Sequence, residues 1–125
     1  MTTTTKTAVY WAEIPVSSLE RAIPFYEAIT AAQFELDETG PNPTAFISKT
    51  GESPYSGGHL YEGKPASNGD GPTVHLAIES VEAAAERAKD AGATLVGPII
   101  EIPVGRFQYI VDLDGNSIGL FEPAS

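Results

Sequence analysis

Two histidines and one glutamate are the residues of this sequence best suited to chemistry. Glu13, His59 and His75 each lie in a short stretch whose alternation of side chains predicts a β-strand. If the three converge, two imidazoles and a carboxylate would suit a divalent metal ion such as nickel, zinc, manganese or iron. Without a metal, Glu13 and His75 could act together as a general base, or simply satisfy one another by a hydrogen bond. A packing role for each histidine stays open.

Other side chains near these positions could contact an organic ligand. Trp11, Tyr61 and Phe121 could form an aromatic floor, although aromatic residues of small sheets also pack as core. Arg106 could bind an anionic group or be solvated. Alternation leaves open whether residues 106 and 108 or residues 107 and 109 face the site. The candidate ligand-binding residues are Trp11, His59, Tyr61, Thr73, Arg106, Gln108 and Phe121, and the candidate catalytic residues are Glu13 and His75.

The first half of the chain predicts one helix among four strands. Residues 8–16 alternate as a strand, with Trp11 and Glu13 on one face. The Ser17-x-x-Glu20 pattern matches a capping box that opens a helix, and Pro24 should kink that helix. Short strands are expected at 34–36, 44–48 and 58–62.

The pattern restarts after residues 63–72, a Gly- and Pro-rich linker. Ser80 can cap a second helix at 81–91, which is offset by 62 residues from the first. Strands are expected at 73–78, 94–102, 107–111 and 117–121. Each half therefore reads βαβββ, and we predict a single domain over 1–125, with one repeat at about 7–62 and another at about 73–123.

The turn at residues 112–116 is the most distinctive motif of the second half. It reads D-L-D-G-N and joins two alternating apolar runs. Asp, Gly and Asn tolerate positive φ or bond to their own backbone, so the stretch predicts a β-hairpin.

Composition restricts the class of partner. The chain has 125 residues, 42% of them hydrophobic, which is enough for one packed core. Seven basic residues against 17 acidic ones give a net charge of −10, so nucleic acid and anionic membrane surfaces are not expected as partners. The absence of cysteine excludes disulfides and thiolate chemistry. No signal peptide or membrane span is recognised, and we expect a cytoplasmic protein.

Two motifs together resemble a known family. The D-x-D-G-N turn followed by I-x-L at 118–120 is similar to the C-terminal signature of the vicinal oxygen chelate superfamily. Residues 11–26, W-A-E-I-P-V-S-S-L-E-R-A-I-P-F-Y, resemble its strand–loop–helix opening. That superfamily contains glyoxalase I, extradiol dioxygenases and bleomycin-resistance proteins. The resemblance implies an α+β fold in which two βαβββ repeats form a curved, cup-like mixed sheet with helices on the outer face, and it implies a homodimer.

The resemblance also implies where metal ligands would stand. Three of the four family positions fall on Trp11, Thr73 and Gly119, which are not ordinary ligands, and the fourth lies near His59. We therefore expect no usual metal site. Glu13 and His75 each lie two residues beyond a family position, so a displaced site of Glu13, His59 and His75 stays open as an alternative.

The favoured function is that of a glyoxalase- or bleomycin-resistance-like protein that binds a small organic molecule in the cup, without the family's metal. The first alternative is a metal-dependent lyase, isomerase or dioxygenase that uses the displaced site. The second is a non-catalytic interaction module.

Overall fold

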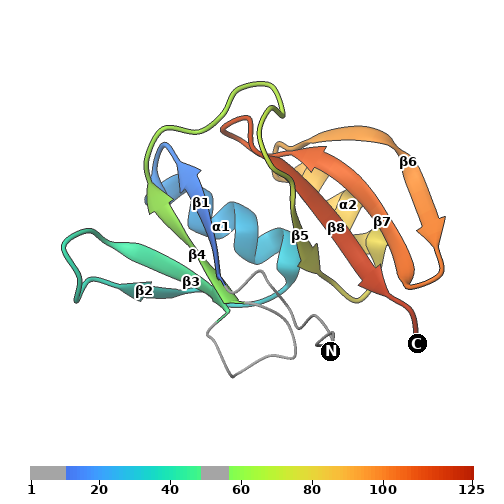
Figure 1. Ribbon diagram of the computed structural model, residues 1–125, viewed down its shortest axis with the longest axis horizontal. Coiled ribbons are helices and arrows are strands. Elements are labelled where there is room, and N and C mark those ends of the chain that lie inside the picture. Colours follow the sequence, from blue (N-terminus) through green and yellow to red (C-terminus); the bar gives the residue numbers. More distant parts are fainter. Residues whose placement is uncertain (1–10, 49–56) are drawn as a thin grey trace, which may run out of the picture.

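The computed structural model describes residues 11–48 and 57–125 (Figure 1). Residues 8–10 of the first expected strand lie outside these residues. The first module contains β1 (Trp11–Val16), α1 (Leu19–Thr30), β2 (Glu35–Asp37), β3 (Thr44–Ser48) and β4 (Gly57–Glu62). The second contains β5 (Val74–Ala77), α2 (Val81–Asp90), β6 (Thr94–Ile102), β7 (Gly105–Val111) and β8 (Ser117–Pro123). The predicted βαβββ order is confirmed in both.

Each module forms one four-stranded mixed sheet, as the predicted α+β class requires. The strand orders are β1-β4-β3-β2 and β5-β8-β7-β6. The pairs β1/β4 and β5/β8 are parallel and the other pairs antiparallel. The two sheets lie side by side with both helices behind them (Figure 1), and the described strands form no closed barrel. No helix of residues 11–48 and 57–125 covers the other face of either sheet; we call these faces the first and second open faces.

Helix α1 begins one residue later than the capping-box pattern predicts. Ser18, not Ser17, is the N-cap, and its hydroxyl accepts a hydrogen bond from the backbone N–H of Arg21 at 3.3 Å. Both serines are suitable caps, so sequence alone could not choose between them. The helix runs through Pro24 and ends at Ala31, which adopts a left-handed conformation at φ 57°.

The internal repeat is visible in how each helix begins. Glu62 at the end of β4 accepts a hydrogen bond from the backbone N–H of Leu19 at 3.1 Å. Glu122 on β8 does the same for Val81 at 2.9 Å. Each carboxylate satisfies an unpaired donor at a helix N-terminus, where negative charge is favoured. Neither helix in the described part of the chain is long and apolar enough to cross a membrane.

The core lies between the helices and the sheets. Alternation places Ile14, Val16 and Leu60 against α1, and Ile110, Ile118 and Leu120 against α2. The residues that these strands turn the other way therefore lie on the two open faces.

The two modules are joined by polar contacts between the β1–α1 part of the first module and the D-L-D-G-N turn. The hydroxyl of Tyr26, buried in α1, donates to Asp112 Oδ2 at 2.5 Å. Ser17 donates to Asp114 through its backbone N–H at 3.2 Å and through its hydroxyl, and Asn116 Nδ2 donates to the Pro15 carbonyl at 2.7 Å. The motif that marks the hairpin therefore also fixes how the second module sits against the first.

We predict that Tyr26→Phe lowers the free energy of unfolding by about 1–3 kcal/mol, because the buried carboxylate of Asp112 loses a donor. Urea unfolding at pH 7 measures the difference. The matched control is Tyr61→Phe, since no hydrogen bond of the Tyr61 hydroxyl is found among the described residues, and it should change stability by less than about 0.5 kcal/mol. Equal effects of the two substitutions would contradict this role of Tyr26.

The effect of Tyr26→Phe on the free energy of unfolding should also depend on pH. Burial, followed by the nearby charge of Asp112, raises the pKa of Tyr26 well above its usual value of 10.0. Above pH 10 the unfolded chain releases this proton before the folded chain does, so the contribution of Tyr26 to stability falls as pH rises. The stability gap between the wild type and Tyr26→Phe should therefore narrow between pH 9 and about pH 11.

Candidate functional site

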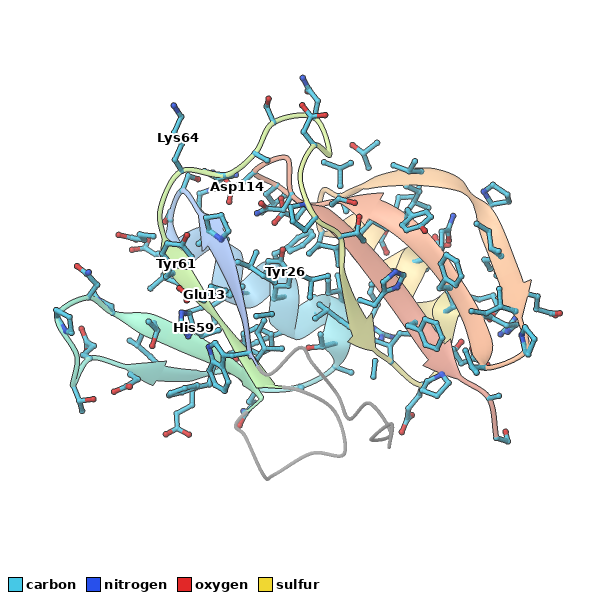
Figure 2. The ribbon with its side chains drawn as sticks, viewed as in Figure 1. Glu13, Tyr26, His59, Tyr61, Lys64 and Asp114 are labelled. Atoms are coloured by element: carbon cyan, nitrogen blue, oxygen red, sulfur yellow. The ribbon has the colours of Figure 1, made fainter. Side chains whose placement is uncertain are left out.

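The first open face carries an aromatic group around His59. Trp11 Nε1 donates to His59 Nδ1 at 2.9 Å, so His59 holds its own proton on Nε2. That Nε2 lies 3.5 Å from Glu13 Oε1, on the neighbouring strand. Rings of Phe46 and Tyr61 pack edge-on against Trp11 and His59, with centroids 6.0 Å apart in both pairs. Figure 2 shows Glu13, His59 and Tyr61 together on this part of the first sheet.

The second open face carries a denser aromatic group around His75. Its imidazole centroid lies 5.3 Å from that of Phe107, 5.7 Å from Phe121 and 5.8 Å from Tyr109. The rings of Phe107 and Phe121 stack at 5.9 Å with an interplanar angle of 6°. We call these four residues the His75 cluster. Although His75 is exposed as a residue, the partial desolvation of its ring among them lowers its pKa and so favours the neutral imidazole.

The backbone explains why these rings meet. His75 on β5 pairs with Gly119 on β8, and Gly119 pairs in turn with Tyr109 on β7. A Cβ atom at position 119 would overlap the imidazole, with Nδ1 of His75 as its nearest atom. The glycine in I-G-L, at the position where the resemblance implies a metal-binding glutamate, thus makes the space that the His75 ring occupies.

The His75 cluster continues into apolar residues of β6. Val96 pairs with Tyr109 and Ile100 with Phe107, and both aliphatic side chains are exposed. At the other end of the face, the hydroxyls of Thr73 and Ser117 form a hydrogen bond of 2.5 Å. The second open face is thus mainly apolar across three strands, with polar groups at His75, at the Tyr109 hydroxyl, at Thr94 and at this hydroxyl pair.

Two of the expected ligand-binding residues lie on the opposite face of β7, next to α2. Arg106 donates to both carboxylate oxygens of Glu82, at 2.7 and 2.8 Å, and to Glu122 at 2.8 Å. These bonds lower the pKa of Glu82 to about 2. Gln108 is buried and donates to the Gly97 carbonyl at 2.8 Å. Neither side chain reaches the His75 cluster.

The remaining predicted residues are divided between the two open faces. Trp11, Glu13, His59 and Tyr61 lie on the first, whereas Thr73, His75 and Phe121 lie on the second. The Glu13–His75 hydrogen bond, one of the alternatives left open by the sequence, is not formed, and Glu13 lies beside His59. Sequence reasoning did not identify Phe46, and it left the orientation of residues 107 and 109 undecided. Counting outward from the turn at 112–116 could have settled it, because that register pairs residue 107 with Phe121.

The donor set does not fit a divalent metal ion. Of the side chains at the implied family positions, the indole of Trp11 and the hydrogen of Gly119 offer no ligand atom, and Nδ1 of His59 already accepts a hydrogen bond. In residues 11–48 and 57–125, no three His, Asp or Glu side chains lie close enough to hold an ion. Glu13 and His59 form a pair that His75 does not join.

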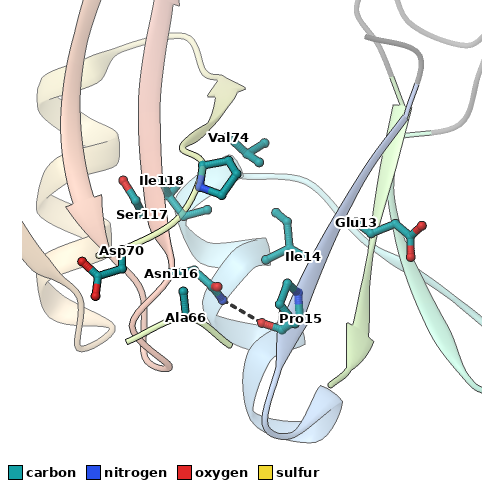
Figure 3. Close-up of a pocket in the computed structure, with 10 residues that line it drawn as sticks. Glu13, Ile14, Pro15, Ala66, Asp70, Val74, Asn116, Ser117 and Ile118 are labelled. Carbon is teal, nitrogen blue, oxygen red and sulfur yellow. Dashed lines mark hydrogen bonds between the residues drawn. The ribbon is translucent and has the colours of Figure 1, made fainter. Parts of the chain in front are cut away.

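A small cavity lies at the seam between the two sheets. It has a volume of about 130 Å³, and its walls come from β1, the 63–73 segment and the start of β8. Ile14, Val74 and Ile118 make it mainly apolar, and Asn116 bridges it to Pro15 (Figure 3). Glu13 is the one predicted site residue in its wall, and Figure 3 shows its carboxylate pointing away.

We predict that Gly119→Ala lowers the free energy of unfolding by about 1–3 kcal/mol, because the new methyl group displaces the His75 ring. Chemical denaturation measures the loss, and the loss should mostly vanish in a His75→Ala background. Gly40→Ala is the matched control, since the nearest atom to its added Cβ is 3.9 Å away. An equal cost of Gly119→Ala with and without His75 would refute this packing.

Comparison with known proteins agrees with the fold and the motifs. No curated protein matches the sequence. Among solved structures, a glyoxalase/bleomycin resistance protein from Albidiferax ferrireducens is 20% identical, with a TM-score of 0.73 over 94% of this chain and all of that one. FosX, a fosfomycin resistance protein from Listeria monocytogenes, is 18% identical, with a TM-score of 0.67 over 97% and 94% of the two chains.

TnmS3, an antibiotic binding protein from a Streptomyces species, is 28% identical, with a TM-score of 0.64 over 95% of this chain and 98% of that one. The sequence profile of one family matches residues 8–120, which include both motifs, the first module and the second module up to Leu120 in β8. The chain therefore belongs to the Glyoxalase/Bleomycin resistance protein/Dioxygenase superfamily.

Proposed function

We propose that this chain binds a small organic molecule on the second open face, without a metal ion. The observation that carries the proposal is the His75 cluster: Phe107, Tyr109 and Phe121 surround an imidazole on a sheet face that no helix covers. Rings that are already packed against one another lose little conformational freedom when a flat ligand adds to the stack.

One relative supports binding rather than a particular reaction: TnmS3 is described as an antibiotic binding protein. The donor set described above argues for binding without the metal on which many family reactions depend. The enzymatic alternatives of the sequence analysis have no specific contact in the described residues that favours them.

The homodimer stays a prediction of the sequence. The physical reason to expect it is that β1 and β5 are edge strands. Each leaves one strand edge without a partner in the described chain. The cytoplasm as its compartment likewise stays a prediction.

We predict that aromatic compounds shift the NMR signals of Phe107, Tyr109 and Phe121 more than those of the first open face. A fragment screen on isotope-labelled protein measures this. Phe121→Leu keeps an apolar side chain but removes a ring, and should weaken binding by about 3- to 10-fold, the value of one aromatic contact.

Tyr61→Leu is the matched control, because it removes a ring from the first open face and should leave affinity unchanged. A ligand whose shifts centre on Ile14, Val74 and Ile118 would place binding in the seam cavity and contradict the proposal. A screen with no ligand at all would favour the interaction-module alternative.

A further inference from the structure

The charges around the second open face restrict what can bind there. The described residues hold five Lys and Arg side chains, Arg21, Lys64, Arg87, Lys89 and Arg106. Arg106 is the one that belongs to a strand of the second sheet, and its guanidinium is turned to the helix side, where two carboxylates hold it. Arg87 is likewise occupied by the carbonyls of Ala28 and Ile29.

An anionic ligand group on this face would therefore find no cation among the described side chains of its strands. Moving a phosphonate, sulfonate or carboxylate out of water without a cationic partner costs a large desolvation free energy. The net charge of −10 adds a general repulsion. An uncharged ligand avoids both costs.

The imidazole of His75 is the polar atom group at the centre of this face. His75 is exposed to solvent, its ring lies against three aromatic rings, and neither of its nitrogens has a hydrogen-bond partner among the described residues. Nδ1 is the ring nitrogen nearer to Gly119, which leaves Nε2 as the more accessible of the two. A neutral imidazole can donate at one nitrogen and accept at the other, and a ligand hydroxyl can meet either.

We propose that the ligand is a planar, uncharged aromatic compound that carries a hydroxyl group, with its rings against Phe121, beside the largely buried Phe107, and its oxygen hydrogen-bonded to His75 Nε2. This inference rests on the proposed function and adds the chemical class of the ligand. It separates the chain from a protein that captures an anionic phosphonate, and it gives His75 a binding role rather than a metal-ligating one.

The test compares four naphthalene probes at pH 7 by calorimetry, with NMR shifts of Phe107 and Phe121 to report the place of binding. The probes are 2-naphthol, 2-methylnaphthalene, naphthalene-2-sulfonate and a naphthyl-trimethylammonium salt. We expect 2-naphthol to bind at least about tenfold more tightly than the sulfonate, the loss expected for an unpaired ionic group.

His75→Phe is the discriminating variant, because it keeps a ring in the cluster and removes the hydrogen-bonding nitrogens. It should weaken the binding of 2-naphthol by about 3- to 10-fold, the value of one hydrogen bond. The affinity for 2-methylnaphthalene should change by no more than about twofold. A merely structural role of His75 would weaken both probes equally, and that result would overturn the inference.

Tighter binding of the sulfonate or the ammonium probe at Phe107 and Phe121 would also overturn it, while leaving the proposed function in place. If no probe and no compound of the fragment screen shifts these two residues, the proposed function fails together with the inference.

Discussion

The carboxylate of Asp112 is the contact on which the arrangement of this molecule depends. One oxygen accepts hydrogen bonds from the backbone N–H groups of Asp114 and Asn116, each at 2.8 Å, and so shapes the β7–β8 turn. The other accepts from the Tyr26 hydroxyl and from Asn116 Nδ2, at 2.5 and 2.9 Å. A single side chain therefore builds the hairpin and joins the second module to α1.

This contact between the modules determines which face of each sheet is open. Because α1 and α2 cover the same side of the two sheets, both modules leave their opposite faces without a helix. The polar side chains of the first open face contact one another, since Trp11 donates to His59 and Glu13 lies beside the same ring. On the second open face, His75 lies against aromatic rings, is exposed to solvent and has no polar partner among the described residues. That difference is why the proposed ligand site lies on the second module.

The sequence predicted the repeat well because repetition needs only local signals. Ser80 and the alternation of 73–78 reproduce the signals of the first half, and the βαβββ order follows from them. The site was harder, because it depends on contacts between strands. Glu13 and His75 are equivalent under the repeat, and equivalence places them on corresponding strands of two different sheets rather than next to each other. Likewise, Phe107 joins Phe121 only through the register of the hairpin.

The central claim is binding on the His75 cluster without a metal ion, and calorimetry with 2-naphthol tests it most directly. The protein is titrated after dialysis against EDTA, and again after addition of nickel, zinc, manganese or iron(II) in equal amount. The account predicts dissociation constants that agree within about twofold, because neither Phe107 nor His75 Nε2 needs an ion to contact the ligand. Binding that disappears with EDTA and returns with one of these ions would contradict it, and would favour the metal-dependent alternative.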